Sequence, residues 1–479
     1  MIRTAPMSHQ RLVVDFCKKE ETEEGAGIFA DYGTGKSLIA LMLVQERQFK
    51  KVLVVSTSLS IETTWCDEIR THTDFKFCIL KGTAKQKANL LEYALNKIKD
   101  PSRYGHAREY TGKPMVFLIN YEGVKAIYRE LTVAGFDAVF LDESTKIKTH
   151  DAERTMAAYE ISERIPHRYV MTGFPVTENL AELYSQIKFI DRGKAFGRSY
   201  YAFLNKYFVR QGPKLAVKKV AIKKILDLIS PFCIRITNES LRLPPKVYKE
   251  ISLEMTEQQR DLLLKLNETF RLELGKVHID TQYIFTLISK SLQICDGFVQ
   301  QITKDEETGK VLSEHVEFID TNKDEALLEV LESINIRKNK VVIWCAFLVS
   351  VSKLEMILKK LKIPTLSLTG KTEDVNKVVQ LFQRSPSHNV LICTQKKAAE
   401  SVTLTSARYG IYYSNIWSYD ARGNSEARIR RKGSEKHSSI MYIDLITKAS
   451  VEKKVYDCLR KKKSLIDELK TAFLEMKQR

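Results

Sequence analysis

The segment GIFADYGTGKSLIALMLV constrains the fold of this chain more than any other part of the sequence. It reads as an apolar strand, a glycine-containing loop and a helix, which is the context that a phosphate-binding loop requires. Gly33 and Gly35, with Thr34 between them, allow backbone N–H groups to turn inward around phosphate oxygens. We expect Lys36 to hold the β/γ phosphates of a nucleotide and Ser37 to offer its hydroxyl to Mg²⁺. The alternative is a tight strand-to-helix turn in which GKS has arisen by chance.

A second motif is acidic and ends an apolar strand, in FDAVFLDESTKIK. Asp142 is placed to bind Mg²⁺ through water, and Glu143 to orient or deprotonate the water that attacks a γ-phosphate. A solvated Asp-Glu pair is the alternative interpretation. The preceding VFL, which puts the pair at the carboxyl end of a sheet, and the glycine-containing loop in the same chain favour the catalytic one.

Short apolar segments alternate with helical patterns in two stretches of the chain, which predicts two doubly wound α/β lobes with parallel sheets. The expected strands of the first stretch are Gly27–Ala30, Val52–Thr57, Met115–Asn120, Ala138–Leu141 and Tyr169–Thr172. The expected strands of the second are Val341–Cys345, Thr365–Leu368, Val390–Cys393, Tyr409–Tyr413 and Ile440–Asp444.

The chain between these stretches has a different character. Thr256–Leu274 and Gln282–Phe298 are long charged segments with helical spacing. The sequence EETGK is typical of a hairpin turn between Gln301–Lys304 and Val311–Phe318. The sequence thus predicts helical insertions between the lobes, one of them with a hairpin.

The length of 479 residues predicts two or three domains, at roughly 100–200 residues per domain. We assign residues 1–255 to a first lobe, with a helical insertion at about 193–230. Residues 256–322 form the helical insertion with the hairpin, and residues 323–479 form the second lobe.

Charge and composition narrow the class of protein. The chain has 77 lysines and arginines against 59 acidic residues, a net charge of +18, which fits a polyanionic partner but also a generally basic protein. No apolar run approaches the ~20 residues that span a bilayer, and the first ten residues lack the apolar core of a signal peptide. We expect an intracellular protein, cytoplasmic or nucleoid-associated, without a membrane partner.

Taken in order, the motifs resemble those of superfamily-two helicases, and among them the Swi/Snf-type DNA-dependent ATPases. ADYGTGKS resembles the family's ADxxGxGK[ST], VLVVSTSLSIETTWCDEI its next strand and Trp-containing helix, and LDESTKIK its DEAH-type box. RYVMTGFPVTENLAELYSQIKFI is similar to the family's LTGTP stretch, with Thr172, Gly173, Pro175 and Asn179 at matching positions. The resemblance implies that Thr172 and Gly173 couple the nucleotide to DNA.

The second half of the chain carries the remaining motifs of this resemblance. PFCIRITNESLRLPPK resembles the family's Arg-containing strand and LPPK link, and SARYGIYYSNIWSYDARGNSEARIRRKG the stretch that ends in its QxxxRxxRxGQ box. Arg428 and Arg431 fall on the two arginines of that box, three residues apart and so on one face of a helix or turn. The resemblance implies that both reach the γ-phosphate from the second lobe.

Further contacts follow from the same resemblance. Gln10, in MSHQRLVVDF, is the candidate for reading adenine. Ser60, Tyr121, Thr369 and Lys371 are the candidates for tracking the DNA backbone. Lysine runs at 214–224, 396–397 and 460–463 and the RIRRK segment are either DNA contacts or solvated faces.

These features predict two RecA-like lobes that use ATP and Mg²⁺ to drive a motor on double-stranded or branched DNA, as a monomer or as an oligomer assembled on DNA. A strand-separating helicase at forks or recombination junctions and a motor on RNA are alternatives within the family. A rival of another class is a regulatory nucleic-acid-binding protein that keeps the ATP fold without hydrolysis. The intact loop, acidic pair and arginines argue against that rival. DNA recombination and repair are compatible settings.

Overall fold

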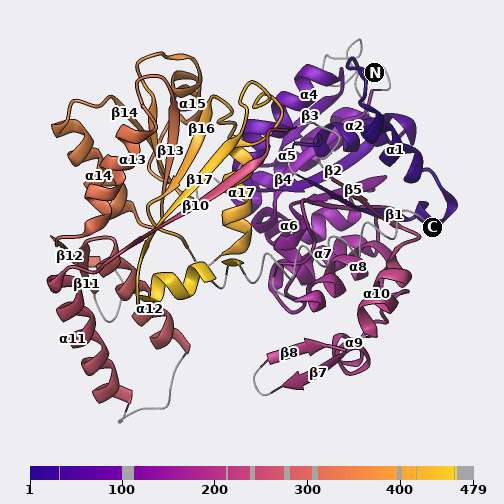
Figure 1. Ribbon diagram of the computed structural model, residues 1–479. Coiled ribbons are helices and arrows are strands. Elements are labelled where there is room, and N and C mark those ends of the chain that lie inside the picture. The colour runs from indigo at the N-terminus through magenta and orange to yellow at the C-terminus, as the bar shows by residue number, and fades with distance from the viewer. Residues whose placement is uncertain are drawn as a thin grey trace. The chain divides into compact units, whose positions relative to one another are not determined.

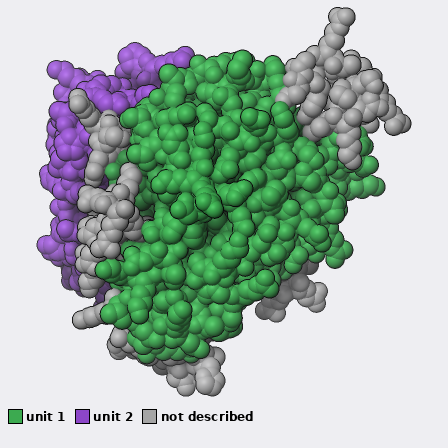
Figure 2. Space-filling view, turned by 90° about the vertical axis from the view of Figure 1, so that its right-hand side faces the viewer, with its two compact units in different colours: residues 1–242, 464–479 green, residues 243–463 purple. Residues whose placement is uncertain are grey.

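The computed structural model describes residues 1–31, 33–99, 113–177, 179–211, 214–218, 220–237, 243–274, 281–304, 311–395, 402–416, 418–457 and 459–460. The chain divides into two compact units, with a boundary between residues 242 and 243 (Figure 1, Figure 2). Across the described ranges, no helix is both long enough and apolar enough to cross a membrane.

The first unit is built on a parallel sheet of seven strands in the order β3-β4-β2-β5-β6-β1-β9 (Figure 1). Its strands are β1 (Gly25–Ala30), β2 (Lys51–Ser56), β3 (Lys76–Ile79), β4 (Met115–Asn120), β5 (Ala138–Asp142), β6 (His167–Thr172) and β9 (Cys233–Ile236). All five strands expected in this half of the chain are present in this sheet, and β3 and β9 extend it. The crossovers between parallel strands are long enough to hold helices.

The helices of this unit are α1 (Ser8–Phe16), α2 (Lys36–Glu46), α3 (Ser58–Ser60), α4 (Cys66–His72), α5 (Ala84–Lys99), α6 (Tyr121–Val133), α7 (Glu153–Ser162), α8 (Leu183–Asp191), α9 (Tyr200–Tyr207) and α10 (Ala221–Ile229). Short turns add η1 (Glu20–Thr22), the π-helix η2 (Ile61–Trp65), η4 (Ser144–Ile147) and η5 (Leu180–Glu182). The sheet is buried on both faces, because successive residues of one strand enter different cores. In β5, Val139 and Leu141 join one apolar cluster, and Ala138 and Phe140 join the other.

The expected insertion at about 193–230 is not purely helical. Between α9 and α10 lies an antiparallel pair of strands, β7 (Phe208–Gln211) and β8 (Lys214–Val217). Arg210 lies opposite Leu215 in this hairpin. The aromatic side chains of Phe203, Tyr207 and Phe208 anchor the insertion in the core of the first unit.

The second unit is built on a parallel sheet of six strands in the order β10-β17-β16-β13-β15-β14. Its strands are β10 (Lys246–Leu253), β13 (Lys340–Cys345), β14 (Thr365–Leu368), β15 (Val390–Thr394), β16 (Ala407–Tyr412) and β17 (Ile440–Thr447). The five strands expected here are confirmed, and the two α/β units confirm the predicted fold class. Successive side chains of a strand again point to opposite faces of the sheet. Ile343 therefore packs in one apolar cluster, and its neighbour Trp344 packs in the other.

The helices of the second unit are α11 (Glu257–Leu274), α12 (Thr281–Cys295), α13 (Asn322–Ser333), α14 (Leu348–Lys360), α15 (Val375–Arg384) and α17 (Tyr419–Ile429). The expected hairpin is present as the antiparallel strands β11 (Phe298–Lys304) and β12 (Val311–Phe318). The turn at 306–310 lies outside the described residues.

The expected boundary at residue 255 is displaced. β10 pairs along its whole length with β17, from Lys246 opposite Ile440 to Leu253 opposite Thr447. The segment that was assigned to the end of the first lobe is therefore an edge strand of the second sheet. The compact unit that contains it begins at Leu243 and includes the helices and hairpin of 256–322.

Candidate functional site

The loop after β1 has the backbone conformation that a phosphate-binding loop needs. Gly33 and Gly35 adopt φ values of +84° and +78°, a left-handed region that disfavours residues with a Cβ. Gly35 is the N-cap of α2, so the first N–H groups of this helix face the loop. A Cβ at Gly35 would also collide with the side-chain amide of Gln10. Both glycines are thus required by the local geometry.

Three side chains fix the middle of this loop. Thr34 is buried, and its hydroxyl donates to the carbonyl of Asp31 at 2.7 Å. Its own carbonyl accepts from Nε2 of Gln10 at 3.1 Å and lies 2.9 Å from Nε2 of His9. The amide oxygen of Gln10 accepts from the N–H of Met7 at 2.9 Å. The structure therefore gives Gln10 the role of holding the loop, while adenine reading stays a prediction.

Lys36 and Ser37 open α2 directly after the glycines. The Lys36 ammonium donates to the carbonyl of Ala30 at 3.0 Å, across the loop. Both side chains are half-buried, so the ammonium and the hydroxyl lie at the positive end of the helix without being sealed in the core. The contacts of Lys36 with phosphates and of Ser37 with Mg²⁺ stay predictions.

Asp142 ends β5 and is held from several sides. Its Oδ2 accepts from the hydroxyl of Ser56 at 2.8 Å and from Nε1 of Trp65 at 2.9 Å. Its Oδ1 accepts from the N–H of Glu143 at 3.1 Å. The side chain is only 6% exposed, and Trp65 is the last residue of the π-helix η2, a distortion that often occurs at functional sites.

Glu143 has a φ of +52°, which is unusual for a residue with a side chain and costs of order 1–3 kcal/mol. This half-buried residue lies between β5 and η4. Such strain is kept where the surrounding contacts over-determine it, and the bonds that fix Asp142 provide these contacts. The carboxylate of Asp142 is therefore anchored at the end of β5, and Glu143 follows it in a left-handed backbone conformation.

The acidic pair is connected to the segment that follows β6. Ser144 donates from its hydroxyl to Oε1 of Gln186 at 2.7 Å, and Nε2 of Gln186 donates to the carbonyl of Pro175 at 2.7 Å. Gln186 is fully buried on α8. The relay ends at Pro175, two residues after Gly173. Thr172 is buried at the end of β6, and the coupling role of Thr172 and Gly173 stays a prediction.

Arg235 on β9 joins the loop to the same segment. Its guanidinium donates to the carbonyl of Phe29 at 3.2 Å and to the carbonyl of Gly173, and it forms an ion pair with Asp31. The side chain is 3% exposed, and its guanidinium carbon lies 5.4 Å from the centre of the Phe174 ring. The sequence identified this strand as Arg-containing. It did not predict that the arginine connects β1, the loop and the end of β6.

Tyr121 and Ser60 are the expected DNA-backbone contacts of the first unit, and that role stays a prediction. Both side chains are buried, and the Tyr121 hydroxyl donates to the carbonyl of Asp142 at 2.7 Å. Burial raises the pKa of Tyr121 well above its usual range, and the neighbouring acidic pair raises it further, so the hydroxyl stays a donor. Tyr121 supports the end of β5 through this hydrogen bond.

Thr369 and Lys371 remain candidates for backbone contact. They lie in the turn after β14, where the Thr369 hydroxyl accepts from the N–H of Lys371 at 3.2 Å. Thr369 is half-buried and Lys371 is exposed. Lys396 and Lys397 lie outside the described residues, as does most of the 460–463 run.

In the second unit, Arg428 lies in the last turn of α17 and is 8% exposed. The helix ends at Ile429, and Arg430 has the extended dihedral angles φ −97° and ψ 85°. Arg431 thus lies beyond the helix, half-buried, with its carbonyl accepting from the N–H of Ser434 at 2.9 Å. The two arginines lie on a helix end and the turn after it.

A buried ionic network holds α17 on the sheet. Arg422 contacts both carboxylate oxygens of Asp444, with Nη2 to Oδ2 at 2.9 Å, and donates to Oδ1 of Asn415 at 3.0 Å. Glu426 accepts from Arg422 at 2.9 Å and from Lys246 at 2.7 Å. The helix that carries Arg428 is therefore fixed to β10 and β17 by charge.

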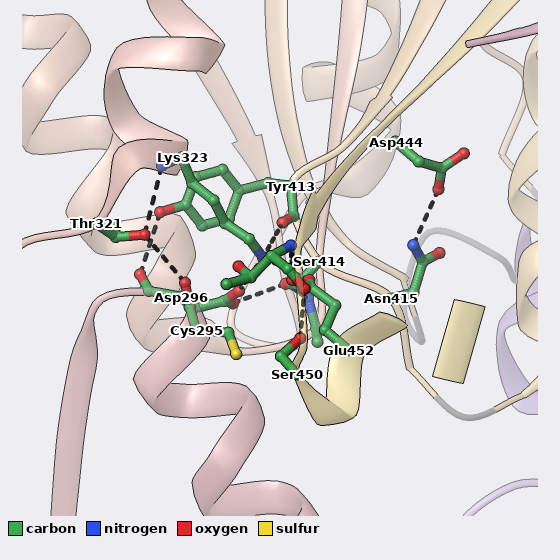
Figure 3. A network of polar contacts seen from close by, with 12 residues as sticks. Cys295, Asp296, Thr321, Lys323, Tyr413, Ser414, Asn415, Asp444, Ser450 and Glu452 are labelled. Carbon is green, nitrogen blue, oxygen red and sulfur yellow. Dashed lines mark hydrogen bonds and ion pairs between the residues drawn. The ribbon is translucent and has the colours of Figure 1, made fainter. Parts of the chain in front are cut away.

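A second buried network lies at the junction of α12, α13 and the segment after β17 (Figure 3). Lys323 is fully buried and pairs with Asp296 at 3.0 Å and with Glu452 at 2.5 Å. Burial opposes the charge on Lys323, but these two carboxylates outweigh burial and raise its pKa. Asp296 also accepts from the hydroxyl of Ser414 at 2.7 Å. The network ties the inserted helices to the second sheet.

The comparisons with known proteins agree with these geometries. A family model described as SNF2-related domain matches residues 9–306, and one described as helicase conserved C-terminal domain matches residues 322–433. An uncharacterized ATP-dependent helicase of Mycoplasma genitalium is 22% identical over 96% of this chain and 41% of its own length. The protein YwqA of Bacillus subtilis is 24% identical over 94% of this chain and 47% of its own length.

The chain thus spans less than half the length of these two curated relatives. Among solved structures, the SWI2/SNF2 ATPase core of Sulfolobus solfataricus in complex with dsDNA is similar at 18% identity and a TM-score of 0.43. That similarity covers 100% of this chain and 96% of the other.

Proposed function

Because this chain belongs to the family of SNF2-related proteins, we propose that it is an ATP-hydrolysing motor that translocates on or remodels double-stranded or branched DNA. The observation that carries the proposal is the carboxyl edge of the first sheet. There the glycine loop, the acidic pair and the segment after β6 are joined by the buried side chains of Arg235 and Gln186. Ligands of parallel α/β sheets bind at this edge.

The residues at this edge fit ATP chemistry. Lys36 supplies an ammonium for the β/γ phosphates, and the backbone N–H groups at the start of α2 supply donors. Glu143 orients the attacking water and takes its proton, a role that a carboxylate at the end of a strand can perform. Asp142, fixed by Ser56 and Trp65, stays in position while this occurs.

Mg²⁺ fits the donors that the chain provides. Asp142 ends β5 with a carboxylate, and Ser37 offers a hydroxyl in the first turn of α2. Few protein oxygens are needed, because Mg²⁺ takes one or two protein ligands and completes its shell with water and phosphate oxygens. Bound with ATP, Mg²⁺ neutralises charge that develops on the phosphates.

The second unit supplies Arg428 and Arg431 for the γ-phosphate. Their position at the end of α17 supports this role, because the Arg422 network makes that helix rigid while the turn after it holds Arg431 at half-burial. A planar guanidinium is suited to bridging phosphate oxygens as negative charge redistributes in the transition state. The protein acts as a monomer or as an oligomer assembled on DNA.

The test is ATP hydrolysis measured with duplex DNA, single-stranded DNA, forked DNA and RNA, together with strand displacement on the same substrates. We expect stimulation by duplex or branched DNA without strand displacement. Strand displacement at forks would instead identify a helicase, and stimulation by RNA alone an RNA motor. The absence of hydrolysis with every nucleic acid would overturn the proposal in favour of a regulatory binding protein.

A further inference from the structure

Half of the net positive charge of the chain lies in residues 192–230. This segment of 39 residues contains ten lysines and arginines and one acidic residue, Asp227, so it contributes +9 of the total of +18. It contains α9, the β7–β8 hairpin and α10, and the hairpin projects from the body of the first unit (Figure 1). Positive charges concentrated in this way repel one another, and they lower the stability of the fold unless an anion compensates them.

Three of these cations make contacts within the protein that stabilise the fold. Arg192 donates to the carbonyl of Ser162 at 3.1 Å, and Lys194 pairs with Glu24 at 2.6 Å. Lys218 donates to the carbonyls of Asn205 and Lys206, at 2.8 and 3.0 Å, and so compensates the negative end of α9. These three are occupied by contacts within the protein.

Five other cations are exposed: Arg198, Lys206, Arg210, Lys223 and Lys224. No carboxylate of the described chain pairs with any of them. Lys223 and Lys224 lie side by side on α10, and Arg210 lies on the hairpin strand β7. The side chains of Lys214 and Lys219 are not among those that the structure describes.

Apolar and aromatic side chains are exposed among these cations. Tyr201 is 65% exposed, Val209 41% and Val220 72%. Single exposed apolar side chains are common on protein surfaces, so the cations that pair with no carboxylate of the described chain, and not these residues, point to a polyanion.

The surface formed by α9, the β7–β8 hairpin and α10 is attached firmly to the site of the first unit. The buried rings of Phe203, Tyr207 and Phe208 anchor it in the core. The side-chain amide of Asn179 donates to the carbonyl of Leu215 on β8 at 3.0 Å. The hairpin is therefore connected by a hydrogen bond to the segment that follows β6.

We propose that this surface, called here the basic hairpin surface, binds the phosphate backbone of duplex DNA through Arg210, Lys223 and Lys224. This deepens the proposed function and rests on it for the identity of the polyanion. Backbone contact needs no base reading, which fits a surface whose exposed charges are mostly flexible cations. Each phosphate that a cation neutralises releases counterions, so binding weakens as salt rises.

The experiment measures the affinity of the full chain for one duplex as a function of salt, for the wild type and for Lys223→Ala/Lys224→Ala. Loss of two phosphate contacts lowers the slope of log K against log salt by about 1.8, at about 0.9 per contact. We expect that change and an affinity at least tenfold lower at moderate salt. Arg210→Ala should lower the slope by about half as much.

The matched control is Lys359→Ala/Lys360→Ala, an exposed lysine pair at the end of α14 in the second unit. It removes the same charge and should leave the slope close to that of the wild type. Melting temperatures of both double variants should equal that of the wild type, because all four side chains are exposed.

The outcomes separate this inference from the proposed function. ATP hydrolysis by the wild type with and without duplex DNA tests the proposed function, whatever the variants do. An unchanged salt slope in Lys223→Ala/Lys224→Ala, or an equal loss in the control, would overturn the basic hairpin surface while leaving a DNA-stimulated ATPase intact. A slope that changes for RNA but not for duplex DNA would overturn it too.

Discussion

The side-chain amide of Asn179 bonds to the carbonyl of Leu215, 3.0 Å away and 36 positions further along the chain. The same side chain accepts, through Oδ1, from the N–H of Ala181 at 3.0 Å and so caps η5. Asn179 thus joins two structures that the sequence treats separately: the segment after β6, which reaches Arg235 and Gln186, and the basic hairpin surface.

Asn179→Asp tests this connection. The carboxylate keeps an oxygen that can cap η5 but loses the amide donor to Leu215. We expect ATP hydrolysis at saturating duplex DNA to fall by about 2- to 30-fold, the range of a coupling energy of about 0.5–2 kcal/mol. ATP affinity should change little. Asn89→Asp, which introduces the same charge at an exposed position of α5, is the control, and equal rates for the two variants would contradict the connection.

Arg431→Ala should lose hydrolysis while keeping ATP and DNA binding, and Arg428→Ala should follow it. A guanidinium that meets the γ-phosphate in the transition state stabilises that state more than the ground state, an effect worth about 10³–10⁵ in rate in phosphoryl-transfer enzymes. The measurement is the ATPase rate at saturating DNA. Recovery to near the wild-type rate at high DNA concentration would make Arg431 a DNA contact instead.

Lys323→Met should destabilise the second unit by about 3–5 kcal/mol, because it leaves the carboxylates of Asp296 and Glu452 buried without their cation. Urea unfolding measures this. The control, Lys360→Met, changes an exposed side chain of the same unit and should stay within about 0.5 kcal/mol of the wild type. A loss below 1 kcal/mol for Lys323→Met would mean that the network stabilises little.

Glu426 predicts a specific sensitivity to acid. Burial favours its neutral form, but Lys246 and Arg422 outweigh burial and lower the pKa of Glu426 to about 2. The unfolded chain protonates this group near pH 4.3, so its contribution to stability is complete above that pH and is lost as the pH falls towards 2. Urea unfolding from pH 5 to pH 3 should show a flatter pH dependence for Glu426→Gln than for the wild type. Parallel curves would contradict this assignment, and the exposed Glu332→Gln serves as control.

The strands were predictable where both faces of a parallel sheet are buried, because such strands read as unbroken apolar runs. β10 was missed because it is an edge strand of partial burial in which Lys246, Lys249 and Glu250 interrupt the apolar residues. Because β10 was missed, the domain boundary was predicted at residue 255 and not between residues 242 and 243. The glycine loop was predictable because its glycines, lysine and serine are contiguous in the chain.

The supports of the site were not predictable, because they depend on contacts between distant positions. Arg235 reaches Phe29 across 206 positions, and Trp65 reaches Asp142 across 77. Tyr121 shows the reverse case, in which a matched position pointed to DNA but the hydroxyl turns inward to Asp142. A resemblance fixes the residue type at such a position, whereas only the packing around it fixes the direction of the side chain.

The measurement that tests the central claim most directly is ATP hydrolysis by the wild type, Lys36→Ala and Glu143→Gln, each with and without duplex DNA, paired with ATP binding. We predict DNA-stimulated hydrolysis in the wild type and its loss in both variants, with ATP still bound by Glu143→Gln and bound poorly by Lys36→Ala. Near-normal turnover in either variant, or a wild type that DNA does not stimulate, would contradict the account.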